Sequence, residues 1–384
     1  MAEQSEERLK IEEDFAYLLM FLPDGWREKA RELGALRRRR KIPDAERLLR
    51  ILLIHLAEGC SLRETALRAQ EANLACLSDV AIMDRLRHAG EWLRWMNGEI
   101  MKKWVGLQPA AVFGDQWNVR VVDATRVKEP GPTGSSWCIH YSIGLPSLSC
   151  QEVLVSDCHG NGESFKRFEV RPGDLLLGDQ VYGAKPGIEH VVAHGGQVLV
   201  RFTPKILPLL GHRTQRLNLL ARLRRLAATE IGDWPAALAC RDPRHRGVEG
   251  RVCAIRKSRE ARERGRRGTL RHGQKSGYPV SPEALELADY VMVFTTVDAA
   301  PLSAARVLEM YRGRWQIELV FKRLKSILGL GHLRKIDARG ARAWLEGKLL
   351  VAFLIEALLR AAESFSPWGY PIGAEQGPRP LPLA

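Results

Sequence analysis

The sequence predicts a mixed α/β protein in which helices precede and follow a β-sheet. Three observations predict this class. Residues 1–105 repeat apolar side chains at helical spacing, residues 116–202 contain short aliphatic runs broken by Gly, Pro and Ser, and residues 303–362 return to helical spacing. With 384 residues and 45% hydrophobic content, the chain is long enough for two or three domains with sizeable cores.

The amino-terminal region, residues 1–110, is expected to be entirely helical. Ser61 can cap one helix, with Glu64 as its capping-box partner, and Ser78 can cap the next. The second helix carries three basic side chains, Arg85, Arg87 and Arg94. A short helix followed by a basic helix is compatible with a helix-turn-helix that contacts DNA, and equally with a bundle whose basic face is solvated.

The first part of the predicted core, residues 116–202, is expected to contain five strands and two helices. The expected strands are Val119–Asp123, Ile139–Leu145, Glu152–Ser156, Leu175–Leu177 and Val198–Phe202. The expected helices are Glu163–Val170 and Ala184–His194. Three closely spaced strands, followed by alternating helices and strands, indicate a mixed α/β sheet.

The next segment, residues 203–288, combines a weak pattern with a strong positive charge. The formal net charge of the whole chain is +14. Residues 201–275 hold 20 Lys and Arg against 6 Asp and Glu, and the charges of the remaining residues balance. A strand pair is expected near Gly247–Ile255, followed by a basic stretch at Arg256–Lys275. Such local basicity indicates a polyanionic partner.

The carboxyl-terminal part is expected to close the core and then continue as helices. Residues 289–335 should supply a strand at Tyr290–Val297 and a helix from Ser303 to about Leu330. Residues 336–366 should form a further helix. The Pro- and Gly-rich residues 367–384 have the composition of a disordered tail.

Several classes of protein are excluded by composition. The longest apolar runs, such as Leu349–Ile355, are far shorter than the roughly 20 residues of a membrane helix. The acidic amino terminus is unlike a secretory signal, and seven widely spaced cysteines without a Cys-x2–4-Cys pair favour reduced thiols over structural zinc. Gly268–Ser276 nearly matches a phosphate-binding P-loop, but Gln274 interrupts it. We therefore expect a cytoplasmic protein that does not bind ATP.

Three carboxylates are candidates for chemistry because of where they stand. Asp123 and Asp179 each close a predicted strand, and Glu318 lies among apolar residues of a predicted helix. Carboxylates at strand ends project into the crevice where ligands gather, and two or three converging oxygen donors would hold Mg²⁺. Asp157 also follows a predicted strand, so spacing alone does not choose between Asp157 and Asp179. A strand-ending Asp is also a common turn residue.

The helix around Glu318 carries a row of polar side chains. Tyr311, Arg314, Glu318 and Lys325 fall within about 60° of one another on an ideal helix, and Lys322 joins the same stripe. Such a row suits a metal-bound phosphodiester, because the carboxylate binds the cation while Arg and Lys hold flanking phosphates. A solvated face with paired charges is the alternative.

These motifs together resemble one known family. The stretch from Tyr311 to Lys325 matches the Tyr-x2-Arg-x3-Glu-x6-Lys signature of DDE-type insertion-sequence transposases, the group numbered family four. Val-Val-Asp123-Ala-Thr, Gly178-Asp-x2-Tyr-Gly and the run from Leu285 to Thr295 are similar to that family as well. The resemblance covers about residues 116–360.

The resemblance implies a ribonuclease H-like core interrupted by a β-rich insertion. It selects Asp179 over Asp157 and makes Asp123, Asp179 and Glu318 the catalytic metal triad. Tyr311, Arg314 and Lys325 would grip the transposon-end DNA, with Lys322 on the same stripe. The implied cofactor is Mg²⁺, with Mn²⁺ as a substitute, in a two-metal phosphodiester reaction.

The same resemblance implies the partners and the place of action. The partners would be double-stranded DNA, both the inverted-repeat ends and the target, and a second copy of the chain in a homodimeric synaptic complex. No membrane is involved, and the protein would act in the cytoplasm, at the nucleoid. Two alternatives remain: a non-catalytic DNA-binding protein derived from a transposase, and a ribonuclease H-like nuclease without strand transfer.

Overall fold

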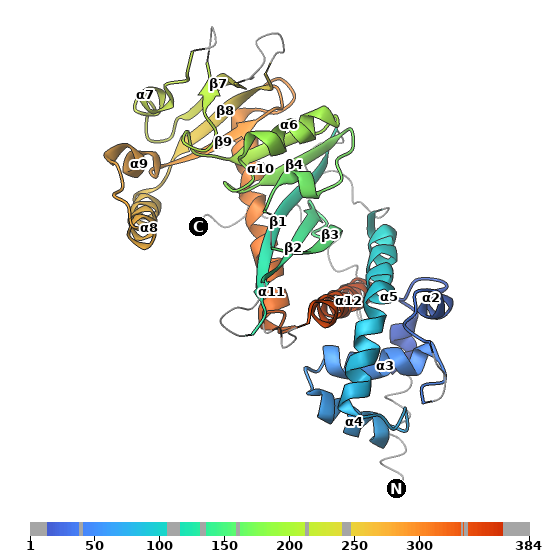
Figure 1. Cartoon of the computed structure of the whole chain (residues 1–384). Coiled ribbons are helices and arrows are strands. Elements are labelled where there is room, and N and C mark those ends of the chain that lie inside the picture. Colours follow the sequence, from blue (N-terminus) through green and yellow to red (C-terminus); the bar gives the residue numbers. More distant parts are fainter. Residues whose placement is uncertain are drawn as a thin grey trace. The chain divides into compact units, whose positions relative to one another are not determined.

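The chain folds into two compact units, seen in a computed structural model (Figure 1). The helical unit comprises residues 1–106, 127–135 and 323–384, and the sheet unit comprises residues 107–126 and 136–322. The structure describes residues 14–37, 41–105, 116–130, 136–158, 162–211, 215–239, 247–331, 333 and 337–363. The expected tail at 367–384 lies outside these ranges.

The helical unit is built from amino-terminal and carboxyl-terminal segments of the chain. Its helices are α2 (Trp26–Glu32), α3 (Ala45–Leu56), α4 (Leu62–Glu71), α5 (Asp79–Val105) and α12 (Ala338–Glu363). The expected helical character of the amino-terminal region is therefore confirmed for its described residues. In the core, the Trp92 indole donates to the carbonyl of Trp26 at 2.8 Å. Because α12 packs against both α5 and α3, the predicted segments 1–110 and 336–366 share one core.

The two predicted helix caps in this unit are present. The Ser61 hydroxyl accepts a hydrogen bond from the N–H of Glu64 at 3.2 Å, and the Ser78 hydroxyl accepts one from Ala81 at the same distance. Two of the three arginines expected on the basic helix are paired with carboxylates of the same unit: Arg87 with Asp337, and Arg94 with Glu91. Within the described ranges, no helix is long and apolar enough to cross a membrane.

A buried carboxyl group lies between the two longest helices of this unit. Glu346 on α12 accepts a hydrogen bond from the side-chain amide of Asn97 on α5 at 3.0 Å. Burial raises the pKa of Glu346 to about 7; the Asn97 hydrogen bond, Arg94 and Arg342 oppose this rise, and Glu91 adds to it. The folded unit therefore binds a proton between about pH 4.5 and 7 that the unfolded chain releases.

We expect Glu346→Gln to stabilise the helical unit at pH 8. Because the folded-state pKa lies above the unfolded value, wild-type stability falls as pH rises from about 4.5 to about 7. The neutral amide escapes this loss, so the variant should gain about 2–3 kcal/mol at pH 8 and little near pH 5. Calorimetric melting at both pH values measures the difference, and an equal gain at pH 5 and pH 8 would contradict it.

The sheet unit contains a nine-stranded mixed sheet in the order β3-β2-β1-β4-β5-β9-β8-β7-β6. Its first five strands are β1 (Asn118–Lys128), β2 (Ser136–Gly144), β3 (Cys150–Asp157), β4 (Asp174–Gly178) and β5 (Gln197–Arg201). All five overlap predicted strands, and β4 and the middle of β5 are fully buried. The pairs β1–β4 and β4–β5 are parallel, and β2–β3 is antiparallel. This mixed sheet is compatible with a ribonuclease H-like core.

Helices cover the two faces of this sheet. In Figure 1, α6 (Lys185–Ala193) lies in front of the strands and α10 (Ala304–Arg312) lies behind them. Ile188 and Val191 of α6 belong to one buried cluster with Leu176 and Val200 of the sheet. The predicted helix at Ala184–His194 is therefore confirmed. The predicted helix at Glu163–Val170 is wrong: only a short 3-10 turn, η1 (Phe165–Arg167), forms there.

The basic segment, residues 203–288, extends the same sheet. It contains β6 (Leu209–Leu210), α7 (Leu219–Leu223), β7 (Ile231–Leu238), β8 (Glu249–Arg256), α8 (Arg259–Ser276) and α9 (Pro282–Leu287). Strand β8 pairs with β9 (Tyr290–Thr295), which in turn pairs with β5. The description β-rich needs correction, because the longest element, the 18-residue α8, occupies most of the expected basic stretch. The P-loop-like residues also lie in α8.

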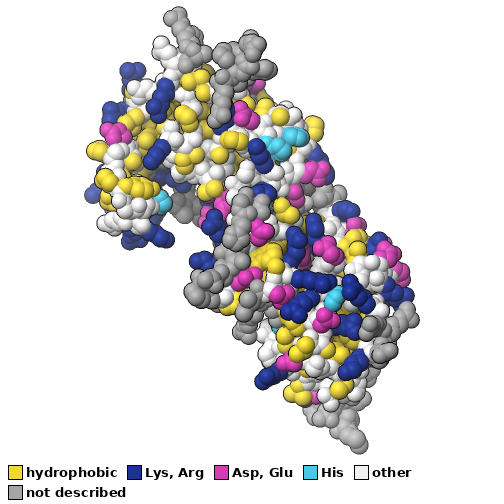
Figure 2. Space-filling model, in the orientation of Figure 1, with side chains coloured by type: hydrophobic (Ala, Val, Ile, Leu, Met, Phe, Trp, Pro, Cys, Tyr) yellow, Lys and Arg dark blue, Asp and Glu magenta, His cyan; other side chains and the backbone are white. Residues whose placement is uncertain are grey.

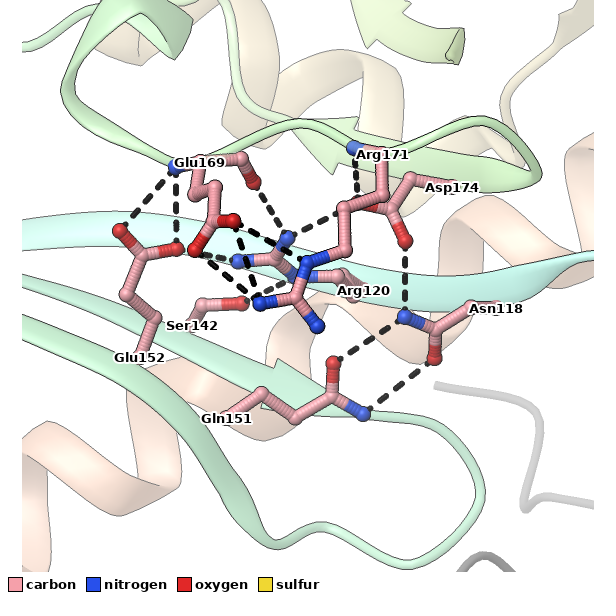
Figure 3. A network of polar contacts seen from close by, with 8 residues as sticks. All are labelled: Asn118, Arg120, Ser142, Gln151, Glu152, Glu169, Arg171 and Asp174. Carbon is pink, nitrogen blue, oxygen red and sulfur yellow. Dashed lines mark hydrogen bonds and ion pairs between the residues drawn. The ribbon is translucent and has the colours of Figure 1, made fainter. Parts of the chain in front are cut away.

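A buried polar network joins four strands at the start of β1 and β4 (Figure 3). The Arg120 guanidinium donates to Glu152 at 2.6 Å, to Asp174 at 3.0 Å, to the Ser142 hydroxyl at 3.1 Å and to the carbonyl of Glu169 at 2.7 Å. The side chains of Arg120 and Asp174 are only 6% and 3% exposed. The outer members are Asn118, Gln151 and Arg171. The network thus fixes the mutual position of the strands that lead to the candidate acids.

Candidate active site

Two of the predicted acids meet on neighbouring parallel strands. The β1–β4 register places Val121 opposite Leu177, so Asp123 and Asp179, each two residues further, are carried to the same edge. Strand β1 continues past Asp123 to Lys128, so the expectation that Asp123 ends its strand is wrong. Asp157 ends β3, and β2 separates that strand from β1. The topology therefore favours Asp179 over Asp157 as the partner of Asp123.

The glycine before Asp179 is required by close packing. A Cβ atom at Gly178 would lie 2.6 Å from the Cβ of Tyr182 and 2.9 Å from the Cζ of Phe165. Any side chain there would push these aromatic rings away. The Asp179 carboxylate then accepts a hydrogen bond from the backbone N–H of Val181 at 2.8 Å. This turn holds the second acid at the end of β4.

The electrostatic environment of Asp123 is unusual for a carboxylate. Burial raises its pKa to about 7, against a hydrogen bond from the N–H of Ala124. The negative charge of Asp179 raises the pKa further, the Arg314 guanidinium lowers it, and Glu163 raises it. Asp123 and Asp179 therefore lie close together in a partly buried position, where a positive charge would stabilise their ionised forms.

The third acid is connected to the first through an arginine. Arg314 Nη1 lies 3.9 Å from Asp123 Oδ2, and its Nη2 donates a hydrogen bond to Glu318 Oε1. The Arg314 side chain is 17% exposed, whereas that of Glu318 is 58% exposed. One guanidinium thus spans the distance between the acid on β1 and the acid on the helix.

The predicted continuous helix is interrupted at this arginine. Tyr311 lies on α10, Arg314 lies in a 3-10 turn, η3 (Gly313–Trp315), and Glu318 lies in the first turn of α11 (Gln316–Ser326). The expectation of one uniform helix face is therefore wrong. The tighter turn changes the angle per residue, yet the Arg314–Glu318 contact persists.

The predicted DNA-binding residues differ in how close they come to the acids. Tyr311 lies beside the site: the Arg314 Cζ is 6.0 Å from its ring centroid. Burial raises the pKa of Tyr311 to about 12, and Arg314 opposes that rise. Lys322 is exposed on α11, about one turn beyond Glu318. Lys325 lies in the last turn of the same helix, about two turns beyond Glu318.

One functional candidate, Glu163, was missed by the sequence reasoning, and it lies beside Tyr182, the tyrosine of the Gly178-Asp-x2-Tyr-Gly motif. Glu163 precedes η1, and its pKa is raised by burial and then by Asp179. The Tyr182 hydroxyl is buried, with no hydrogen-bond partner among the described residues, and burial followed by Asp123 and Glu163 raises its pKa. The rings of Tyr182 and Phe165 pack 5.1 Å apart, which brings the start of η1 to the site. No spacing in the sequence singles out Glu163.

The donor set suits a hard divalent cation. Carboxylate oxygens are the ligands that Mg²⁺ and Mn²⁺ prefer. The nearby charges of Asp123 and Asp179, together with the raised pKa of Asp123, show where a cation would be favoured. Within the described part of the chain, no three Asp, Glu, His or Cys side chains are grouped closely enough to hold a metal. Glu318 instead binds Arg314.

Comparisons with known proteins place the chain among related sequences. Residues 154–354 match the family described as transposase DDE domain. The chain is 32% identical over 352 residues to the putative transposase InsL for insertion sequence element IS186A of Escherichia coli (strain K12), covering 90% of this chain and 93% of that protein. It is 32% identical over 353 residues to the transposase for insertion sequence element IS421 of Escherichia coli, with the same coverage.

The family follows from these matches. The chain belongs to the DDE-type insertion-sequence transposases. The resemblance inferred from the Tyr-Arg-Glu-Lys motif is therefore confirmed.

Proposed function

We propose that this transposase cleaves DNA at the ends of an insertion sequence and joins the freed ends to target DNA, using Mg²⁺. The observation that carries the proposal is the meeting of Asp123 and Asp179 on parallel strands, with Arg314 linking Asp123 to Glu318. In this proposal β1–β5 and β9 form a ribonuclease H-like catalytic core, and residues 203–288 are its insertion.

The residues divide into those that hold metal and those that hold DNA. Asp123, Asp179 and Glu318 would hold Mg²⁺, or Mn²⁺ in its place. Bound ions would activate the attacking hydroxyl and stabilise the departing oxyanion of an in-line displacement. The Arg314 guanidinium can donate two parallel hydrogen bonds to phosphate oxygens. Tyr311, Lys322 and Lys325 would hold the flanking DNA.

The proposed partners are inverted-repeat ends, target DNA and a second copy of the chain. The two ends of an element must be brought together before joining, and a homodimeric synaptic complex would do this. We propose that the protein acts in the cytoplasm, on the nucleoid.

The test is an assay of cleavage and joining. Purified protein, linear DNA carrying the element's inverted repeats, target plasmid and Mg²⁺ should give double-ended cleavage and joined product. Binding of the ends without cleavage would favour a non-catalytic DNA-binding protein. Cleavage without joining, even when a pre-cut end is supplied, would favour a nuclease.

Glu163 is proposed as a further positioning residue of this site. Its negative charge lies close enough to influence Asp123, Asp179 and Tyr182. Glu163→Gln is therefore expected to lower the cleavage rate by about 10–100-fold, as loss of partners of metal ligands does, and to raise the Mg²⁺ concentration for half-maximal cleavage.

The matched control is Glu189→Gln, which neutralises an acid that pairs with Lys185 on α6. Its rate and Mg²⁺ dependence should equal those of the wild type. An unchanged Mg²⁺ dependence in Glu163→Gln would refute the positioning role, whatever happens to the rate.

A further inference from the structure

Helix α8 is held firmly against the sheet unit by one side. The Ser258 hydroxyl caps its first turn by accepting from the N–H of Ala261 at 3.3 Å. Arg266 donates two hydrogen bonds, of 2.8 and 2.6 Å, to the buried carboxylate of Asp289 just before β9. At Gly265 an added Cβ would lie 2.9 Å from the carbonyl of Ala288, so helix and chain approach closely. The helix is therefore a fixed element of the unit.

The outer side of α8 carries a row of basic side chains, called here the α8 stripe: Arg264, Arg267, Arg271 and Lys275. All four are exposed. Their spacing of three, four and four residues places them within about 80° around the helix axis and over about 16 Å along it. In Figure 2, Lys and Arg side chains (dark blue) are visible on the surface around the place where Figure 1 labels α8.

The α8 stripe differs from Arg259 and Arg266 of the same helix in lacking acidic partners. Arg259 pairs with Glu263 at 3.4 Å, and Arg266 pairs with Asp289. Among the described residues, none of the four stripe residues has a carboxylate within 4.0 Å; the Glu260 carboxylate influences Arg264 only from further away. Four neighbouring like charges on a fixed helix repel one another. An anionic ligand would reduce this electrostatic repulsion.

We propose that the α8 stripe binds the phosphate backbone of double-stranded DNA independently of base sequence. A rigid row of cations about 16 Å long fits a polymer that carries one negative charge per roughly 1.7 Å of its axis. Exposed guanidinium groups suit bidentate contact with phosphate. The stripe lies on α8, whose neighbour β8 is joined through β9 to the strands that carry the acids. This inference rests on the proposed function, since it takes DNA as the polyanion.

The experiment compares two variants of the full-length protein. One replaces the four stripe residues with Gln; the control, Arg224→Gln with Arg259→Gln, removes two exposed arginines that are already paired with Glu286 and Glu263. Affinity for a short duplex of arbitrary sequence is measured between about 50 and 200 mM salt. The stripe variant should lower the slope of log affinity against log salt by about 3–4, because each phosphate contact contributes about 0.9.

The outcomes separate this inference from the proposed function. Equal salt slopes in the stripe variant, the control and the wild type would overturn the role of the stripe while cleavage by the wild type still stood. A reduced slope in the stripe variant together with wild-type protein that never cleaves would keep the stripe and remove the proposed activity. Unchanged circular dichroism and melting of the stripe variant establish that it is folded.

Discussion

Glu318→Gln is expected to abolish strand cleavage while leaving binding to the element's ends intact. The amide keeps the size of the side chain and can still contact Arg314, but it removes the negative charge with which Glu318 would bind Mg²⁺. Loss of a ligand should cost more than the roughly 10–100-fold seen for partners of metal ligands. Cleavage of end-labelled DNA in Mg²⁺ measures the first effect, and a mobility shift of the same DNA measures the second.

The chain offers a close control for this substitution. Glu309 lies on α10, is exposed, and pairs with Arg306 at 2.6 Å, so Glu309→Gln removes an equal charge nearby in sequence without touching the acids. Its cleavage rate should match that of the wild type. Equal rates in Glu318→Gln and the wild type, with Mg²⁺ present, would remove Glu318 from the site.

Arg120→Ala is expected to be the most destabilising of the substitutions considered. The change leaves Asp174, which is 3% exposed, and Glu152 without their common partner. Breaking a buried ion pair from one side typically costs about 3–5 kcal/mol. Because the network joins β1, β2, β3 and β4, we expect the melting transition of the sheet unit to move to lower temperature, as calorimetry would record.

Arg171→Ala tests whether burial is the reason for this effect. Arg171 belongs to the same network and pairs with Glu169 at 3.1 Å, but both side chains are about two-thirds exposed. Exposed pairs contribute only about 0–1 kcal/mol, so this variant should melt almost like the wild type. Equal losses in the two variants would contradict the assignment of the stability to the buried part of the network.

The strands could be predicted from sequence more readily than their lengths or partners. Leu175–Leu177 is buried on both faces, and such runs identify strands by composition alone. The continuation of β1 beyond Asp123 was missed because an Asp after an apolar run is a common turn residue. Strand β7 was missed because it contains Pro235 and a glycine, which usually argue against a strand. Tertiary pairing outweighed local propensity there.

In the candidate site, too, features local in sequence could be predicted, whereas those that depend on tertiary packing could not. The Tyr-Arg-Glu-Lys row was visible because its four positions lie on one short stretch of chain. The choice of Asp179 over Asp157 needed the resemblance, since spacing did not decide it, and the strand order then favoured the same residue. Glu163 could not be predicted, because it reaches the acids through the packing of Phe165 on Tyr182, which no sequence spacing encodes.

The way in which residues 203–288 join the sheet limits how this protein can be divided. Strands β8 and β9 share a full antiparallel ladder, and β9 leads directly toward α10 and the Arg314 turn. Excising the segment would leave backbone N–H and C=O groups along one edge of β9 unpaired, and such an edge can pair with strands of other molecules. It is therefore not a detachable module. A shortened enzyme made by deleting it would aggregate rather than retain a minimal catalytic core.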